Sequence, residues 1–485
     1  MIIIGVSSGP ILPFDTLMIP VTLKDRKRIA IASSSIISSK PSKSTIMKSS
    51  DSSSIISSKF KIGFLSYDFN DHPTAHLVEA IFDVTNDRRI ENNCNTNNMN
   101  SNNIYCNTEL LIFNYGYHDN STYRMKLEGL ADKFLDMGLL SHEDASKVIE
   151  NEGISILLDM QVHTLGNRMA ILAHRPAPLQ INYLVYPGTS GASFLDHIVV
   201  DHIVAPLEHA HYYTESYLML PPTYQISFYD RHILPQDDVK TINDLYEQKL
   251  LIRREYGIPD DDDAIIICNF NKIDKIDQLS FTSWMRILLR VPKSYLWLLE
   301  PSHKRGEYDT YDAMQHNTIA KNNLINNAIV MGISPHRIIF ARRVPKRDHI
   351  LRHRAVDLFL DTFVYGAHST ATDALRGGLP VLTLQGPDFP SRVATSLYAS
   401  FNTKKQNILQ LYEVLVCSNI KEFEDTAVEL LHDKQYINRI KMTINSLIMN
   451  KIGLFNTRQD VDKFLYGLQA LEETKNDKRY NVIIL

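Results

Sequence analysis

The chain has 485 residues, a formal net charge of −4 and four cysteines. The length suffices for two domains of ordinary size, and the near-neutral charge argues against binding to nucleic acid or to an anionic membrane surface. The cysteines contain no C-x-x-C pair, so neither a zinc site nor a disulfide framework is expected, and a soluble, reducing compartment is the default. No basic leader and no run of about 18 apolar residues is present, so neither a signal peptide nor a transmembrane helix is expected.

Short apolar runs alternate with amphipathic helical patterns along most of the chain. This alternation is typical of βα units in a parallel sheet, and it occurs twice, so the fold class is α/β with two βα domains. The Ser-rich and Asn-rich stretches bury too little apolar surface to fold alone. The expected parts are a divergent segment (1–32), a Ser-rich disordered linker (33–58), a first domain (59–230) with an Asn-rich insertion (92–107), a linker (231–248) and a second domain (249–485).

The first domain opens with a strand over residues 59–69, followed by His72 and Pro73. Pro73 suits the first position of a helix, which places His72 at the helix N-terminus, where the positive end of the dipole lowers an imidazole pKa. A neutral His72 beside the carboxyl end of a strand suits a general base or a hydrogen-bond donor. The alternative is an ordinary N-cap histidine.

A later strand end in this domain also carries candidate chemistry. Asp159 and His163 follow the strand expected over 154–158, so in a parallel sheet they lie at the same edge as His72. A solvated loop is the alternative. The turn that begins at Gly188 offers backbone N–H groups to a ligand. The other expected elements are strands at 110–113, 181–185 and 194–200 and helices at 123–134 and 142–150.

The second domain places three cationic or imidazole side chains near its strand ends. Lys275 comes just past the strand over 264–270, where an ammonium group can reach a pyrophosphate as a point charge. Lys346 and His349 lie at the start of a helix and are placed to flank a nucleobase. The other expected elements are helices at 249–256, 280–291, 420–445 and 458–473 and strands at 295–299 and 337–340.

Residues 356–384 form the most informative stretch, because they predict a complete βαβ unit. A strand over 356–360 is followed by a loop ending in His368, a helix that begins at Ser369-Thr370, and a strand over 380–384. The free N–H groups and dipole of a helix N-terminus make an anion site, above all for phosphate. His368 is placed to donate to a phosphate oxygen, and Asp373 lies on the same helix face, where it suits a ribose. The alternative is a capped helix with a surface histidine.

The sequence lacks the motifs of two kinds of site. Neither domain shows the G-x-G-x-x-G fingerprint after its first strand, which argues against a nicotinamide or flavin oxidoreductase. The acidic run over 260–263 has no second cluster of metal ligands, so a solvated turn is preferred to a metal site.

Nine short motifs, in a fixed order, closely resemble the catalytic region of the protein O-GlcNAc transferases, which form glycosyltransferase family 41. The resemblance covers about residues 59–475 and, more weakly, 10–30. The motifs begin at His72 (HPTAH), Arg175 (RPAP), Tyr186 (YPGTSG), Cys268 (CNFN, with KID from Lys275), Trp297 (WLL), Arg337 (RIIF), Ala367 (AHST, with Asp373), Ser391 (SRVA) and Leu454 (LFNT).

The resemblance implies a GT-B fold, in which two Rossmann-like domains face each other and UDP-GlcNAc binds mainly to the second. It implies inverting, metal-independent transfer of GlcNAc to Ser or Thr hydroxyls of intracellular proteins, in the cytoplasm or nucleus. By motif match, Lys275 neutralises the pyrophosphate, and His368, Ser369 and Thr370 hold the phosphates. Asp373 then binds the ribose, and Lys346 and His349 the uracil. His72, Asp159 and His163 lie on the acceptor side.

The chain departs from the family pattern at several points. No 34-residue repeat precedes the catalytic region, which leaves a fragment, an incomplete gene model or a short form as explanations. Asp274 stands where an aromatic residue is expected, and Lys272 where an amide is expected. Rival functions are a GDP-fucose-dependent protein O-fucosyltransferase and an inactive scaffold that binds a sugar nucleotide.

Overall fold

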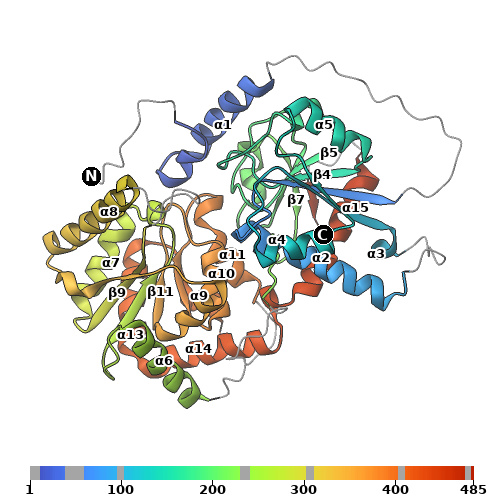
Figure 1. Cartoon of the computed structure of the whole chain (residues 1–485). Coiled ribbons are helices and arrows are strands. Elements are labelled where there is room, and N and C mark those ends of the chain that lie inside the picture. The colour runs from blue at the N-terminus through green and yellow to red at the C-terminus, as the bar shows by residue number, and fades with distance from the viewer. Residues whose placement is uncertain are drawn as a thin grey trace, which may run out of the picture. The chain divides into compact units, whose positions relative to one another are not determined.

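The computed structural model describes residues 11–38, 59–94, 103–229, 241–301, 311–401, 410–475 and 482–484. The chain divides into two compact units, each built on a parallel β-sheet with helices (Figure 1). The N-unit comprises Ile11–Thr16, Val21–Arg231 and Leu454–Leu485, and the C-unit consists mainly of His232–Gly453.

The N-unit sheet has the strand order β14-β7-β6-β5-β4-β1-β2-β3, and every pair is parallel. Its central strands are apolar along their whole length, because in a parallel sheet helices cover both faces. Ile62, Phe64, Leu111 and Leu157 are all fully buried. The strands are β1 (Phe60–Ser66), β2 (Thr108–Asn114), β3 (Lys133–Asp136), β4 (Ile156–Asp159), β5 (Leu179–Asn182), β6 (His197–Val200), β7 (Ser216–Met219) and β14 (Val482–Ile484).

The N-unit helices begin at residues with the expected capping chemistry. Ser121 and Ser141 each accept a hydrogen bond from the backbone N–H three residues on, at the starts of α4 and α5. The helices are α1 (Leu23–Ser38), α2 (Pro73–Glu91), α3 (Ile104–Asn107), α4 (Thr122–Leu130), α5 (His142–Asn151) and α15 (Thr457–Thr474).

The C-unit sheet has the order β10-β9-β8-β11-β12-β13 and is also parallel throughout. Its strands are β8 (Ile265–Asn269), β9 (Ser294–Leu299), β10 (Ile338–Ala341), β11 (Leu358–Leu360), β12 (Val381–Leu384) and β13 (Val416–Cys417). Its helices are α6 (Ile242–Tyr256), α7 (Gln278–Arg290), α8 (Tyr311–Val330), α9 (Lys346–Arg352), α10 (Ser369–Arg376), α11 (Val393–Ala399), α12 (Leu411–Leu415), α13 (Ile420–His432) and α14 (Lys434–Met449).

In each sheet, successive strands are first added on one side of the first strand and then on its other side. In the N-unit the chain runs from β1 to β2 and β3, then returns to β4 on the other side of β1. In the C-unit it runs from β8 to β9 and β10, then returns to β11. Ligands of open α/β sheets bind beyond the carboxyl ends of the two strands at such a reversal. We call these ends the N-unit switch point (β1 and β4) and the C-unit switch point (β8 and β11).

Several expected boundaries are wrong, and the single helix predicted over 420–445 is two helices, α13 and α14. The linker predicted over 33–58 begins inside α1, which continues to Ser38; the rest of that linker lies outside the described residues. The helix predicted over 123–134 ends at Leu130, because β3 begins at Lys133 and pairs with β2. The linker predicted over 231–248 already contains the start of α6, whose capping box joins Thr241 and Asp244.

The carboxyl end of the chain also differs from the prediction, since residues 454–485 belong to the N-unit and not to the second domain. The Thr457 hydroxyl donates to the Ser227 carbonyl at 2.7 Å, and the Arg88 guanidinium of α2 pairs with Asp462 of α15 at 2.5 Å. Beyond α15, β14 pairs with β7. The chain therefore returns to complete the sheet with which it began.

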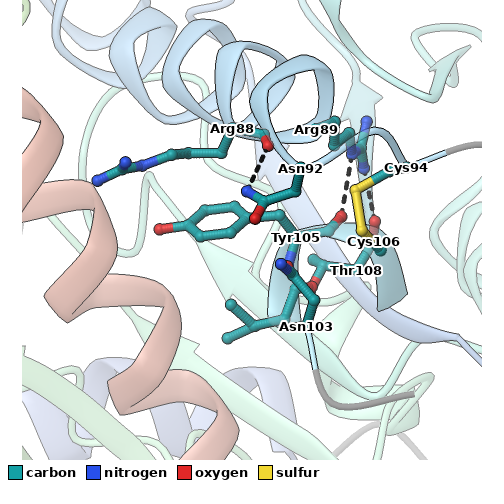
Figure 2. The surroundings of a disulfide bond; sticks show 9 residues. Arg88, Arg89, Asn92, Cys94, Asn103, Tyr105, Cys106 and Thr108 are labelled. Atoms are coloured by element: carbon teal, nitrogen blue, oxygen red, sulfur yellow. Dashed lines mark hydrogen bonds between the residues drawn. A yellow bond between two sulfur atoms is a disulfide. The ribbon is translucent and has the colours of Figure 1, made fainter. Parts of the chain in front are cut away.

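A disulfide joins Cys94 and Cys106, so the expectation of no disulfide is wrong. Figure 2 shows the cause, because the Arg89 side chain at the end of α2 donates to the carbonyls of Tyr105 and Thr108 on either side of Cys106. These bonds hold α3 against α2 and bring the two cysteine Cα atoms to 5.1 Å, within the range that a disulfide spans. Spacing alone gave no sign of this contact.

Two kinds of feature are absent from the described residues. No helix in this part of the chain is long and apolar enough to cross a bilayer. Within the same residues, no group of three or more His, Cys, Asp or Glu side chains is arranged to hold a metal ion.

Candidate functional site

The C-unit switch point is organised by a buried carboxylate that directly follows β11. Asp361 Oδ1 accepts hydrogen bonds from the backbone N–H groups of Thr362 (2.8 Å) and Ala367 (2.7 Å), and Oδ2 accepts one from the Thr383 hydroxyl (2.8 Å). Burial raises the pKa of Asp361 to about 6, although these bonds favour the charged form. The carboxylate closes the loop over 361–367 and so fixes where α10 begins.

The first turn of α10 presents unsatisfied backbone donors, as the sequence predicts. The helix begins at Ser369 with His368 as its N-cap, and the first N–H groups that find a partner are those of Ala371 and Thr372, both bonded to the His368 carbonyl. The N–H groups of Ser369 and Thr370 have no acceptor among the described residues. Ser369 and Thr370 are partly exposed, so an incoming anion can reach them.

His368 is held in one tautomer. Its Nε2 lies 3.0 Å from the Pro390 carbonyl, which only accepts, so Nε2 carries a proton. Burial and the nearby Lys275 lower the pKa of His368 well below its ordinary value, so Nδ1 is an unprotonated acceptor. Donation from His368 to a phosphate therefore requires an anion that first raises the imidazole pKa.

Lys275 lies beside this helix start. Its ammonium group donates to the Gly366 carbonyl at 2.9 Å and sits 3.8 Å from the centre of the Tyr365 ring. Burial lowers the pKa of Lys275 to about 7, while the Asp361 carboxylate opposes the shift. A cation held in these surroundings gains from an anion more than an exposed lysine does, because less water screens the pair.

Lys346, His349 and Asp373 come together as a group. The Lys346 ammonium pairs with the Asp373 carboxylate at 2.6 Å, and His349 Nε2 lies 3.7 Å from the same carboxylate. Arg352 donates to His349 Nδ1, which leaves the proton on Nε2. Burial is the main cause that lowers the pKa of His349 well below its ordinary value. The start of α9 and the middle of α10 thus form one polar patch.

Asn271 links the two loops of the C-unit switch point, and the sequence analysis missed it. Its side-chain amide donates to the Thr362 hydroxyl at 3.0 Å, and its carbonyl oxygen accepts from the Thr370 hydroxyl. Lys275, His368, Ser369, Thr370 and Asp373 are therefore brought together around the carboxyl ends of β8 and β11. Asn271 and Asp361 both directly follow predicted strands, and that position was the signal for them.

A cavity of about 280 Å³ lies elsewhere, at the amino ends of β8 and β11. Its Asp357 carboxylate pairs with Lys249 at 2.6 Å and with the adjacent Arg253 at 2.7 Å. Although burial opposes it, these cations and Lys441 lower the pKa of Asp357. The cations of this cluster pair with the Asp357 carboxylate, and the cluster lies at the start of two strands.

Asp159 ends β4 at the N-unit switch point and is only partly satisfied. Its Oδ1 accepts the Gln161 N–H at 3.0 Å, but Oδ2 has no hydrogen-bond partner among the described residues. Burial raises the pKa of Asp159 to about 6. Three residues on, Val162 adopts a φ of +48°, which is strained for a β-branched side chain. A buried carboxyl with one unused oxygen beside a strained residue is typical of a site for chemistry.

His163 completes this loop in a fixed orientation. Its Nε2 donates to the Ser190 carbonyl at 2.7 Å, and its ring packs edge-on against Tyr186 at 5.2 Å. Burial lowers the pKa of His163, and the Ser190 carbonyl and the Glu215 charge partly offset this. Nδ1 is therefore the basic nitrogen of this imidazole.

His72 is the N-cap of α2, which confirms the capping alternative. Its Nδ1 accepts the Thr74 N–H at 3.3 Å, and Asp68 lies 3.5 Å from the same nitrogen. Since Nδ1 accepts from the backbone, the neutral ring carries its proton on Nε2 and acts as a donor. Capping and chemistry do not exclude each other here.

Asp68 and Gln161 join the loops after β1 and β4, and both were missed. The Gln161 side-chain amide donates to Asp68 at 2.7 Å and the Gln161 N–H donates to Asp159 at 3.0 Å, so hydrogen bonds link Asp68 to Asp159, with His72 Nδ1 3.5 Å from Asp68. Gln161 follows a predicted strand, but Asp68 lies inside the strand predicted over 59–69, whereas β1 ends at Ser66.

The turn at Gly188 does not offer its amides freely. The Gly188 N–H bonds to the Tyr186 carbonyl at 3.0 Å, and the Ser190 N–H bonds to Glu215 at 2.7 Å. The contribution of Gly188 to donor binding stays a prediction, and it would have to use a group other than this N–H.

The sequence of the whole chain resembles a known protein family. The sequence pattern of the family described as "Glycosyl transferase family 41" matches residues 9–250 and 236–464. The chain belongs to glycosyl transferase family 41. This confirms the family resemblance read from the nine motifs.

The relatives of this family 41 chain carry related names. It is 32% identical over 377 residues to "Probable UDP-N-acetylglucosamine--peptide N-acetylglucosaminyltransferase SEC" of Arabidopsis thaliana, covering 78% of this chain and 33% of the relative. It is 26% identical over 489 residues to "UDP-N-acetylglucosamine--peptide N-acetylglucosaminyltransferase" of Caenorhabditis elegans, covering 80% and 38%. The chain thus matches 33% and 38% of the length of these curated relatives.

A solved structure supports the fold. A mutant of the O-GlcNAc transferase of Thermobaculum terrenum matches with a TM-score of 0.72 at 19% identity, over 95% of this chain and 76% of that one. The α/β fold with two parallel sheets is therefore the GT-B fold, as the resemblance implied.

Proposed function

We propose that this family 41 chain transfers GlcNAc from UDP-GlcNAc to Ser or Thr hydroxyls of proteins, with inversion at the sugar and without a metal. The observation that carries the proposal is the C-unit switch point: the Ser369 and Thr370 N–H groups have no acceptor among the described residues, and the Lys275 ammonium contacts the loop just before them at the Gly366 carbonyl. The names of the relatives supply the sugar and the protein acceptor.

In this proposal the C-unit holds the donor. Ser369, Thr370 and Lys275 bind the diphosphate, and a diphosphate beside His368 raises that imidazole's pKa until Nδ1 also donates. Asp373 binds the ribose hydroxyls, and its carboxylate also pairs with the Lys346 ammonium. Lys346 and His349 then flank the uracil.

Departure of UDP is the step that the C-unit accelerates. Negative charge grows on the diphosphate as the bond to the sugar breaks, and preorganised cations and N–H groups stabilise that charge most. Lys275 and the α10 N-terminus supply positive charge without a divalent ion. Turnover is accordingly expected to be unchanged in the presence of EDTA.

The N-unit is proposed to manage the proton of the acceptor hydroxyl. His163 Nδ1 and the unused Asp159 oxygen are the basic atoms at its switch point, whereas His72 offers a donor. We therefore assign the general base to the loop over 159–163 and an orienting role to His72.

Incubation of the chain with radiolabelled UDP-GlcNAc and a Ser/Thr-rich peptide tests the proposal. Label in the peptide, with a β-configured anomeric carbon by NMR, is expected. Transfer from GDP-fucose instead would establish the O-fucosyltransferase, and nucleotide binding without any transfer would establish the inactive scaffold. Either result overturns the proposal.

A further inference from the structure

A buried glutamate holds the turn that contacts His163. Glu215 directly precedes β7 and is 5% exposed. Its Oε1 accepts the Ser190 N–H at 2.7 Å, and its Oε2 accepts the Thr189 hydroxyl at 2.6 Å. Oε2 also accepts the hydroxyl and the N–H of Thr214, at 3.0 and 3.2 Å. Both oxygens of this carboxylate are therefore committed to the turn over 189–191 and its neighbour Thr214.

The opposite side of the same turn is covered by α1. The Ser34 hydroxyl donates to the Ser190 carbonyl at 2.7 Å. Gly191 has a φ of +68°, and a Cβ on it would lie within 2.2 Å of the Ala30 backbone, so only glycine fits there. The turn is thus clamped between α1 and Glu215.

This clamp determines the state of His163. The Ser190 carbonyl has two lone pairs, and one accepts from Ser34 while the other accepts from His163 Nε2 at 2.7 Å. A carbonyl held in this orientation keeps the imidazole proton on Nε2. The only other ring group described against this imidazole is Tyr186, which does not compete for either nitrogen.

No lysine or arginine pairs with Glu215 among the described residues, so its charge is not neutralised locally. That charge is one of the causes that keep the His163 pKa from falling further on burial. A buried carboxylate without a cation depends on hydrogen-bond donors, and the four described here come from Thr189, Ser190 and Thr214.

We propose that Glu215 is a positioning residue for the acceptor-side base. By fixing the turn over 189–191, it holds the Ser190 carbonyl where it pins His163 as the Nε2–H tautomer and leaves Nδ1 to receive a proton. The inference rests on the proposed function for its chemical meaning, but the tautomer itself can be measured without any turnover.

Nitrogen-detected NMR of ¹⁵N-histidine-labelled full-length chain tests this, with His163→Asn used to assign the signal. Wild type is expected to show the Nε2–H tautomer, and Glu215→Gln a mixture of tautomers with a lower His163 pKa. Gln keeps one oxygen for the Ser190 N–H but puts an NH₂ group where Oε2 accepts the Thr214 N–H, so the turn is held less firmly. An unchanged tautomer in folded Glu215→Gln would overturn the proposal.

Asp201→Asn is the matched control. Asp201 is also a buried carboxylate in the N-unit and accepts the N–H groups of Ile203, Val204 and Tyr224 at 2.8 to 2.9 Å. Its loss is expected to lower stability and leave the His163 tautomer unchanged. Equal tautomer changes in both variants would show a general loosening of the fold and refute a specific role for Glu215.

Kinetics provide the second readout. Glu215→Gln is expected to lower kcat about tenfold with the KM for UDP-GlcNAc within about twofold, because a misplaced base slows proton transfer and not donor binding. A rise in KM with kcat unchanged would contradict the assignment. If the chain transfers no GlcNAc, the proposed function fails, but the NMR result still decides the role of Glu215.

Discussion

Asp159 and Asp361 occupy the same place in the two sheets and do different things there. Each lies at the carboxyl end of the strand to which the chain returns at its switch point, and burial raises the pKa of each to about 6. Both Asp361 oxygens accept hydrogen bonds, Oδ1 from its own loop and Oδ2 from Thr383 of β12, whereas Asp159 Oδ2 has no partner among the described residues. The Asp361 carboxylate holds its loop in place, and the Asp159 carboxylate keeps one oxygen without a described partner.

The surroundings of the two residues extend the contrast. The C-unit switch point gathers an ammonium group and two backbone N–H groups that have no acceptor in the described part of the chain, which suit an anion. The N-unit switch point gathers carboxylates and imidazoles, which suit a proton. The same backbone arrangement thus serves opposite chemistry, and the side chains just after the strands decide which.

The largest expected difference concerns stability. Asp361→Ala leaves two backbone N–H groups and a hydroxyl without their buried acceptor, and each costs about 1–3 kcal/mol, so the free energy of unfolding should fall by about 3 kcal/mol or more. Asp159→Ala removes fewer bonds together with a poorly satisfied charge and should cost about 1 kcal/mol. Urea unfolding of both variants measures this. Equal losses would erase the distinction between the two carboxylates.

Lys275→Ala should lower kcat by roughly 10²-fold or more, because the departing diphosphate loses its nearest cation. Lys272→Ala is the matched control, since Lys272 is exposed and already pairs with Asp274. It should change kcat by less than about threefold, in keeping with the small worth of a surface pair. Steady-state transfer assays on the two variants separate them, and similar kinetics would remove the special role of Lys275.

Asp159→Asn should lower kcat by roughly tenfold to hundredfold while UDP affinity stays within about twofold. The wild-type rate should fall as the pH drops below about 6, where the Asp159 carboxylate takes up a proton. The rate of the variant should not show this fall. Rate–pH profiles and calorimetric UDP titration measure the two effects. A variant that loses UDP binding would place Asp159 on the donor side instead.

The pH dependence of stability gives a smaller effect that both carboxylates share. Their pKa values are near 3.8 when exposed and about 6 in the folded chain, so the folded state retains protons that the unfolded state releases. The free energy of unfolding should therefore fall as pH rises from about 4 to 6, by up to about 1.4 kcal/mol per pH unit for each group. Denaturant titrations of Asp159→Asn and Asp361→Asn across this range should each show a shallower slope. Slopes identical to wild type would contradict the raised pKa values.

The sequence predicted that Lys275 and the start of α10 lie at one edge of the second sheet, because the pattern that places them there is local. Lys275 follows one strand, and His368 to Asp373 follow another within a single βαβ unit, so spacing placed them. The sequence did not predict Asn271 or Glu215 as partners, because their contacts span 99 and 26 positions respectively. Such contacts depend on how strands and loops pack, which periodicity does not encode.

Other misses have equally physical causes. β3 is a four-residue edge strand with exposed ends, so its pattern merges with the preceding helix. The return of α15 and β14 to the N-unit depends on contacts such as Arg88 with Asp462, 374 positions apart. The Cys94–Cys106 disulfide depends on α3 docking beside α2, which the Asn-rich composition concealed.

A crystal structure of the chain with UDP tests the central claim most directly. The account predicts diphosphate oxygens within about 3 Å of the Ser369 and Thr370 N–H groups and of Lys275 Nζ, with the ribose on Asp373. A nucleotide bound elsewhere, or a C-unit switch point that stays empty at saturating UDP, would contradict it.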